Sequence, residues 1–379
     1  MSSEASADRH KPGLDAIRGL AVLLVILTHW GFLEFGWIGV QLFFVLSGYL
    51  ISSILIRERS LPLAFYLKRF YWRRTLRIFP LYYAYLLALT VITISLPTRL
   101  FVPERHAFER YAVSLFTYTF NYAVVTPDFE HSFFFTHFWS LAVEEQFYLV
   151  WPLLVSRLSP GRLRRLLWFV VLLGAPLARF VTCQWVSSSA GGADLGAKAA
   201  YLFTPGQLDA FAAGSLLACA HVANGPNRGR WPLWGLAALV ATAVIHGAVL
   251  SGQGLGEPTA FGFPSHMPWN YQYVWGYSIL NLGCVSLIAL VSSAPEAGGK
   301  LDRYVLGYLG RRSYALYVFH WPLVNLFGRF VSRTLGLSHF TSFLLYLPVL
   351  ILSVEVSWRL LEAPLLKIKD RRFRRPEPA

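Results

Sequence analysis

WIGVQLFFVLSGYLISSILI, residues 37–56, is a run of twenty residues that contains no charged side chain. An α-helix rises about 1.5 Å per residue, so a helix of roughly this length spans the hydrocarbon core of a bilayer. A helix that is apolar on every face belongs in lipid or in a large core rather than on a soluble surface. The segment therefore predicts a membrane-spanning helix.

The composition of the whole chain also indicates a membrane protein. Of 379 residues, 55% are hydrophobic, 16% aromatic and only 14% charged, against roughly 25% charged in an average soluble domain. Disordered, collagen-like and disulfide-scaffold classes are excluded. We predict one all-α integral membrane domain over residues 1–379, with a polar N-terminal tail (1–12) and a basic C-terminal tail (367–379).

Apolar runs near bilayer length predict about ten transmembrane helices. Their approximate boundaries are 17–35, 37–56, 78–96, 138–156, 166–186, 201–221, 232–250, 272–292, 313–331 and 341–361. An eleventh run within residues 109–126 is shorter and more polar. We expect it to be re-entrant or interfacial, inside a long outer loop of about 97–137.

The distribution of basic residues predicts the orientation. Lys and Arg give the chain a net charge of +14, and with ten crossings nearly all of that excess falls on one face. Because cytoplasmic loops carry the excess of Lys and Arg, both termini are expected in the cytoplasm. The location expected is the bacterial inner (plasma) membrane, with lipid as a partner and no nucleic acid.

The start of the chain and its cysteines give two further expectations. The first apolar run is interrupted by Arg18 and His29 and lacks a small-residue cleavage site, so it predicts a retained helix rather than a signal peptide. Cys183, Cys219 and Cys284 lie in separate apolar segments without a metal-binding or disulfide spacing. They are expected to be buried small hydrophobic residues.

Arg18 and His29 are the first candidates for function. They are eleven positions apart, which at about 100° per residue places both on one helix face, roughly 16 Å apart along the axis. Ionisable side chains at membrane depth are unfavourable and therefore mark functional sites. The alternatives are an interfacial anchor for Arg18 and a satisfied helix-packing histidine for His29.

Glu144 and Glu145 lie near the start of the fourth run, about 9–11 Å below its outer end, and His29 is about 9 Å deep. These depths predict that one of the two carboxylates hydrogen-bonds the imidazole, sets its tautomer and raises its basicity. Such a histidine suits a general base that acts on a hydroxyl. The alternative for Glu144 is a side chain that faces the headgroups.

Arg73, Arg74 and Arg77 precede the third run. Residues three apart are neighbours on a helix, so Arg74 and Arg77 are spaced to hold a phosphate or a lipid headgroup from one side. Positive-inside topology explains basic residues here but not the choice of arginine, whose planar guanidinium matches phosphate. We expect a phosphate-bearing ligand.

Several polar residues remain in apolar runs. Ser47 precedes Gly48, a pattern typical of helix packing, and His320 precedes Trp321. Asp209, Glu355 and Glu362 are expected to pair with basic residues. The outer-loop cluster Asp128, Glu130, His131 and His137 matches no strong metal-binding spacing, so no metal is predicted.

Six segments together resemble the acyltransferase 3 family of membrane-bound acyl-CoA:hydroxyl acyltransferases, which O-acylate carbohydrates and some macrolides. They are GLDAIRGL (13–20) leading to His29, GVQLFFVLSGYL (39–50), RRTLRIFP (73–80), FWSLAVEEQFY (138–148), SYALYVFHWP (313–322) and EAP (362–364). The resemblance runs through nearly the whole chain. It implies that His29 takes part in acyl transfer and that Arg74 and Arg77 belong to a cytoplasmic arginine motif.

The chain departs from the family in two respects. The family often has an arginine two residues before its in-membrane aspartate, whereas here Gln207 precedes Asp209, which leaves the partner of Asp209 open. Some members carry a fused extracytoplasmic hydrolase-like domain. From its length we expect none in this chain.

These features predict an O-acyltransferase that moves an acyl group, expected to be acetyl, from cytoplasmic acyl-CoA to a carbohydrate hydroxyl on a cell-surface polysaccharide or glycolipid. The expected roles fall into three groups. Donor phosphates are assigned to Arg74 and Arg77 with Arg73; passage and catalysis to Arg18, His29 and Glu145 or Glu144; and weak substrate contacts to Ser47, Trp139 and His320.

Three alternatives stay open. A transient acyl-histidine is the less favoured chemical variant, because it needs His29 unprotonated and unhindered. Buried His, Glu and Arg also build proton-coupled transporters. The acceptor is otherwise a small secondary metabolite such as a macrolide.

Overall fold

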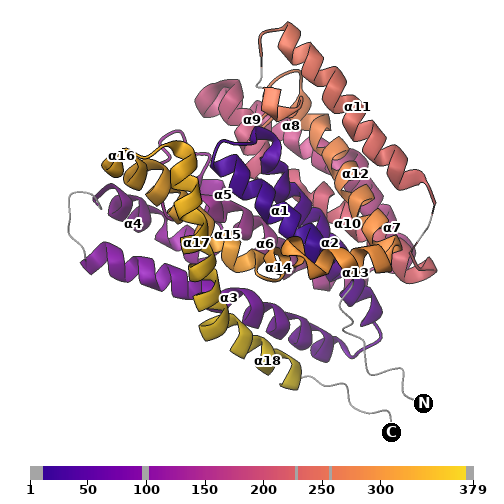
Figure 1. Ribbon diagram of the computed structural model, residues 1–379. Coiled ribbons are helices and arrows are strands. Elements are labelled where there is room, and N and C mark those ends of the chain that lie inside the picture. The colour runs from indigo at the N-terminus through magenta and orange to yellow at the C-terminus, as the bar shows by residue number, and fades with distance from the viewer. Residues whose placement is uncertain (1–11, 96–101, 227–228, 256–257, 373–379) are drawn as a thin grey trace.

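The structure is a computed structural model that describes residues 12–95, 102–226, 229–255 and 258–372 (Figure 1). Within these residues the chain forms eighteen α-helices joined by short 3-10 and π-helical turns, and no β-strand. The predicted all-α fold is confirmed for this part. Residues 1–11 of the polar tail and 373–379 of the basic tail lie outside the described residues.

The helices follow one another in chain order. They are α1 Leu14–His29, α2 Ile38–Arg57, α3 Leu63–Ser95, α4 Val102–Phe116, α5 Phe120–Ala123, α6 Trp139–Arg157, α7 Pro160–Phe169, α8 Ala175–Val186, α9 Gly192–Leu202, α10 Thr204–Asn224, α11 Trp231–Gly252, α12 Gln272–Ser293, α13 Pro295–Arg303, α14 Val305–Arg311, α15 Ser313–Asn325, α16 Ser332–Leu335, α17 His339–Ser357 and α18 Ala363–Arg372.

Each of the ten predicted runs falls largely on helical residues. In the part of the chain that the structure describes, six helical stretches are long and apolar enough to cross a membrane. They are Glu34–Arg57, Leu63–Ser95, Pro160–Ser189, Trp231–Gly252, Gln272–Ser293 and His339–Ile368. The chain is thus a multi-pass membrane protein by length and composition, while the total of ten crossings and the orientation of the termini remain predictions.

The third helix differs from its prediction. We expected the span to begin at the arginine motif, but α3 is a single helix of 33 residues that begins at Leu63. The arginines therefore sit inside a continuous helix, which tolerates them because they face a cavity described below. After the undescribed residues 96–101, α4 and α5 have only 15 and four residues, too short for a simple crossing.

Helices α1 and α2 lie near the centre of the bundle, with α11 at one edge and α3 with α18 at the opposite edge (Figure 1). Glycines bring α2 close to α10. A Cβ added at Gly48 would overlap the carbonyl oxygen of Phe211, and one added at Gly214 would overlap that of Val45. Small residues at such crossings let helices pack closely in a membrane, and this contact holds Ser47 in its place.

Candidate active site

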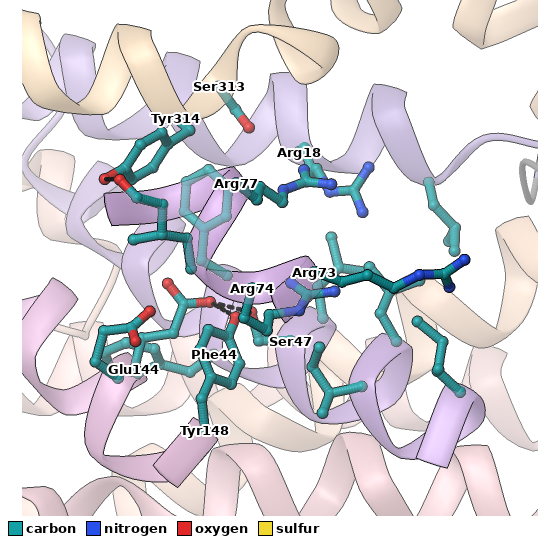
Figure 2. Close-up of a pocket in the computed structure, with 18 of the residues that line it drawn as sticks. Arg18, Phe44, Ser47, Arg73, Arg74, Arg77, Glu144, Tyr148, Ser313 and Tyr314 are labelled. Atoms are coloured by element: carbon teal, nitrogen blue, oxygen red, sulfur yellow. Dashed lines mark hydrogen bonds between the residues drawn. The ribbon is translucent and has the colours of Figure 1, made fainter. Parts of the chain in front are cut away.

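A cavity of about 540 Å³ opens among the arginines of α1 and α3 (Figure 2). Six helices, α1, α2, α3, α6, α14 and α15, contribute to its walls together with the stretch from Trp358 to Leu366. Arg18, Arg73, Arg74 and Arg77 point into it (Figure 2). We call this space the arginine cavity.

The arginines of this cavity differ in their partners. Arg18 forms an ion pair with Asp15, one turn earlier on α1. Arg74 stacks on the ring of Tyr148, with 5.4 Å from its guanidinium carbon to the ring centroid. Among the described residues, neither Arg74 nor Arg77 has an ion pair or a side-chain hydrogen bond. Two half-buried guanidiniums in this state call for an anionic ligand.

The two glutamates also line the arginine cavity. Glu144 accepts hydrogen bonds from Ser47 and Tyr148, and the Tyr148 hydroxyl donates as well to Ser47 Oγ at 3.2 Å (Figure 2). Glu145 Oε1 is buried and has no hydrogen-bond partner in the part of the chain that the structure describes.

The predicted hydrogen bond between one of these carboxylates and His29 is therefore wrong. The depth estimate placed the groups along their helix axes but did not settle the side of α6 from which Glu144 and Glu145 project. That side faces α2 and α3, whereas His29 lies beyond the cavity wall. The role of either glutamate in catalysis remains a prediction.

His29 faces a second, smaller cavity of about 150 Å³, which we call the histidine cavity. Its aromatic walls come from five segments of the chain. They include Trp37, Trp139, Tyr201, His266 and Trp321. Burial lowers the pKa of His266, which lies between α11 and α12, to about 4, so this side of the cavity is uncharged at neutral pH.

His29 has a partner that differs from the predicted one. His320 Nε2 lies 3.1 Å from His29 Nδ1, and the Trp321 ring meets the His29 ring edge-on at a centroid distance of 4.8 Å. His320 itself is fully buried and lines neither cavity. The weak substrate contact expected of His320 remains a prediction; in the structure its side chain lies against His29.

The segment before α6 supports α15 from the side. Trp321 Nε1 donates to the Ser132 carbonyl at 3.0 Å, and the Ser132 hydroxyl donates to Glu104 at 2.5 Å. Burial raises the pKa of the Glu104 carboxyl above its usual value. Through these contacts α4 and the stretch around Ser132 hold Trp321 against His29.

The two cavities share two lining residues, Val40 on α2 and Tyr317 on α15. The Tyr317 hydroxyl bonds to Ser140 Oγ and donates to the carbonyl of His137 at 3.2 Å. A ligand in the arginine cavity is thus separated from His29 by a thin wall. Sequence reasoning missed Tyr317, although its position three residues before His320 places both on one side of α15.

The in-membrane acids have varied partners. Asp209 pairs with Arg179 at 2.9 Å. The partner that the sequence left open, because Gln207 replaces the arginine found in many family members, is thus an arginine of α8. Glu355 pairs with Arg312, as predicted. Glu362 instead accepts from the Ser357 hydroxyl at 3.0 Å, and the described residues show no ion pair for it.

Asp128 and Glu130, in the segment between α5 and α6, pair with Arg110 on α4. His137 is separated from these acids and packs near His320, with 5.1 Å between ring centroids. The four residues that formed one cluster in the sequence are therefore separated: Asp128 and Glu130 pair with Arg110 at the surface, His131 is exposed beside Phe129, and His137 lies near His29.

Known proteins are similar to this chain over most of its length. O-acetyltransferase OatA of Staphylococcus aureus is 26% identical over 373 residues, which cover 95% of this chain and 58% of the relative. Peptidoglycan O-acetyltransferase OatA of Listeria monocytogenes is 29% identical over 377 residues, which cover 95% of this chain and 56% of the relative. The chain thus spans less than two thirds of the length of either relative.

No solved structure matches the chain. The family described as an acyltransferase domain matches residues 11–362, which include every predicted site residue and all residues that line the two cavities except Leu366. The chain belongs to this acyltransferase family, the acyltransferase 3 family.

Proposed function

We propose that this protein is a membrane-bound O-acyltransferase that moves an acetyl group from acetyl-CoA to a hydroxyl of a carbohydrate. Family membership supports the reaction class. The names of the two relatives support acetyl as the group and a cell-wall polysaccharide such as peptidoglycan as the acceptor.

One observation carries the proposal. A cavity that presents Arg74 and Arg77 without ion-pair partners among the described residues shares Val40 and Tyr317 with the cavity that holds His29. The first space suits a polyphosphate head, because guanidinium groups bind phosphate by paired hydrogen bonds. The second places a base close to where the far end of such a ligand would arrive. An acyl donor that is anionic at one end and carries its reactive group at the other fits both cavities.

In this proposal the arginine cavity faces the cytoplasm of a bacterial cell, where acyl-CoA is found. Arg74 and Arg77, with Arg73 as a third contact, hold the phosphates. Arg18 lines the way toward Val40 and Tyr317, since it stands on the same face of α1 as His29, about 16 Å from it along the axis.

The acceptor enters from the histidine cavity. Its aromatic walls provide stacking surfaces for a sugar ring, and Trp139 is among them. His29 takes the proton of the acceptor hydroxyl, whose oxygen then bonds to the thioester carbonyl carbon as the carbon–sulfur bond breaks. The protonated imidazole returns its proton to the leaving sulfur, so acid and base are the same residue.

The test uses the purified full chain in detergent with acetyl-CoA and soluble peptidoglycan fragments, and follows release of free thiol and acetylation of the fragments by mass. The wild type is expected to release thiol only when acceptor is present. His29→Ala should lower the rate by at least about 10²-fold, the contribution of a general base, with an unchanged melting temperature. Full activity of this variant would overturn the proposed role of His29.

The donor site has its own variant. Replacing Arg74 and Arg77 with Gln should raise the KM for acetyl-CoA at least about tenfold, since charge-assisted hydrogen bonds contribute roughly 1.5–3 kcal/mol each and 1.4 kcal/mol is a factor of ten. Arg105→Gln is the matched control, because Arg105 forms an exposed pair with Glu109 on α4. An unchanged KM in the double variant would place the donor elsewhere.

A further inference from the structure

We propose that His320 is a positioning residue that selects the tautomer of His29, so that His29 Nε2 is the atom that takes the proton from the acceptor. The inference rests on the proposed function for its chemistry but on hydrogen-bond geometry for the tautomer. It replaces the carboxylate partner that the sequence favoured with a neutral imidazole.

The hydrogen bonds of His320 determine which of its two ring nitrogens carries the hydrogen. Its Nδ1 lies 2.6 Å from the carbonyl oxygen of Tyr317. A carbonyl oxygen only accepts, so His320 Nδ1 carries the hydrogen. In a neutral imidazole the other nitrogen, Nε2, then holds a lone pair and accepts.

His320 is neutral because nothing near it balances a charge. It is fully buried, and the rings that face it are His29 from α1, His137 from the segment before α6 and Tyr317 from its own helix. No carboxylate contacts it within the described residues. A buried imidazolium without a counter-ion is strongly unfavourable.

His320 in turn determines which ring nitrogen of His29 carries the hydrogen. Its Nδ1 lies 3.1 Å from His320 Nε2, which accepts, so His29 Nδ1 must donate. The hydrogen of a neutral His29 is therefore on Nδ1, and Nε2 holds the lone pair. Which ring nitrogen of a histidine is protonated depends on the hydrogen bond that the other one makes.

Neighbouring groups keep the His320 ring from adopting another arrangement. His137 Nε2 donates to the carbonyl of Val318 at 3.2 Å, so His137 does not compete for His320 Nε2 through that atom. Trp321 is anchored on Ser132 and meets the His29 ring edge-on. The His29 ring is thus held from α15 by two consecutive residues.

The arrangement has a chemical consequence. When His29 Nε2 takes the hydroxyl proton, the positive charge spreads to Nδ1–H, which already donates to the lone pair of His320. The bond strengthens as the charge develops, which is the property that lowers a barrier rather than merely improving binding. This is the logic of a catalytic triad, in which a third group orients the base.

Three substitutions separate positioning from packing. His320→Gln keeps an acceptor near the place of Nε2, His320→Asn is too short to reach His29, and His320→Phe fills the space without an acceptor. We expect Gln to retain activity within about tenfold. Asn and Phe should lose about 10²-fold in kcat, with KM for acetyl-CoA within twofold. His106→Gln, on an exposed histidine of α4, is the control and should match the wild type.

The pH profile adds a readout that loss of packing would not move. In the Asn and Phe variants the acidic limb of kcat should shift to lower pH, because the protonated form of His29 loses the acceptor that stabilises its Nδ1–H. Equal losses in all three variants with unchanged profiles would overturn the proposal and leave His320 a packing residue.

The tautomer is also measured without any substrate. Ring-nitrogen NMR of isotope-labelled histidine in the full chain, with His29→Gln to assign the signal, should show His29 protonated at Nδ1 and bare at Nε2. An Nε2–H signal would overturn the inference whatever the activity. If instead the tautomer is as expected but no acceptor is acetylated, the geometry stands and the proposed function fails.

Discussion

At the scale of single residues, the most enclosed charges among the described residues lie away from both cavities. Arg179 and Asp209 are each fully buried and 2.9 Å apart. Arg179 also donates to the carbonyls of Gly206 and Val274 at 2.7 and 2.8 Å and lies over the ring of Tyr277. Through these contacts of its two terminal nitrogens, Arg179 joins α8, α10 and α12.

This pair yields a prediction for stability. Asp209→Ala leaves the Arg179 charge buried without a counter-ion, so it should lower the free energy of unfolding by about 3–5 kcal/mol. Replacing both residues with apolar ones, Arg179→Met with Asp209→Leu, should be milder than Asp209→Ala alone. Thermal unfolding in detergent, followed by tryptophan fluorescence, measures both.

The matched control is Glu109→Gln, which breaks the exposed Arg105–Glu109 pair and should change stability by less than about 1 kcal/mol. A double variant that is less stable than Asp209→Ala would contradict the account. It would show that the ion pair itself stabilises the fold, and does more than keep the Arg179 charge from being left without a counter-ion.

At the scale of helices, α1 is held in place by α13 and α14. Asp302 accepts hydrogen bonds from the backbone nitrogens of Gly13 and Ala16 at 2.6 and 2.8 Å, so a carboxylate distant in sequence caps the first turn of α1. Gly19 and Gly310 let α1 and α14 approach. A Cβ added at either would overlap a backbone carbonyl oxygen of the other helix.

Gly19→Ala and Gly310→Ala are therefore predicted to push α14 away from α1 at a loss of about 1–3 kcal/mol each. Because Arg18 is next to Gly19, the KM for acetyl-CoA should rise as well. Gly161→Ala is the control: no atom lies within 4 Å of its added Cβ, so melting temperature and KM should be unchanged. Wild-type values for both test variants would contradict the close packing.

The contrast between α1 and α6 shows how far sequence reasoning reaches. The spacing of Arg18 and His29 placed both correctly on lining faces of α1, because two residues on one helix share a single axis. The partner of His29 depended on the rotation of α6 and α15 about their own axes, which long-range packing decides. The helices were therefore predictable from apolar runs, while the pairs His29–His320 and Arg179–Asp209 were not.

At the scale of the whole molecule, the proposed reaction requires the bundle to have a particular orientation in the membrane, because the donor is expected on one side and the acceptor on the other. Helix α4 lies at one end of the bundle and α7 at the other (Figure 1). Helix α6 runs from Trp139, at the histidine cavity, to Arg157, just before α7. The arginine cavity, lined by Glu144 and Tyr148 further along α6, lies nearer the α7 end, which the positive-inside rule predicts to be cytoplasmic.

Cysteine labelling tests this orientation. In a chain whose three cysteines are replaced by Ser, His106→Cys on α4 and Arg162→Cys on α7 place single exposed thiols at the two ends. A membrane-impermeant maleimide added to intact cells should label residue 106, whereas residue 162 should be labelled only after the cells are permeabilised. Labelling of residue 162 in intact cells would put Arg74 and Arg77 on the side that lacks acyl-CoA. The assignment of acyl-CoA as the donor would then fail even if His29 and His320 were arranged as described. The arginines that bind the phosphates of the donor have to face the compartment that contains acyl-CoA.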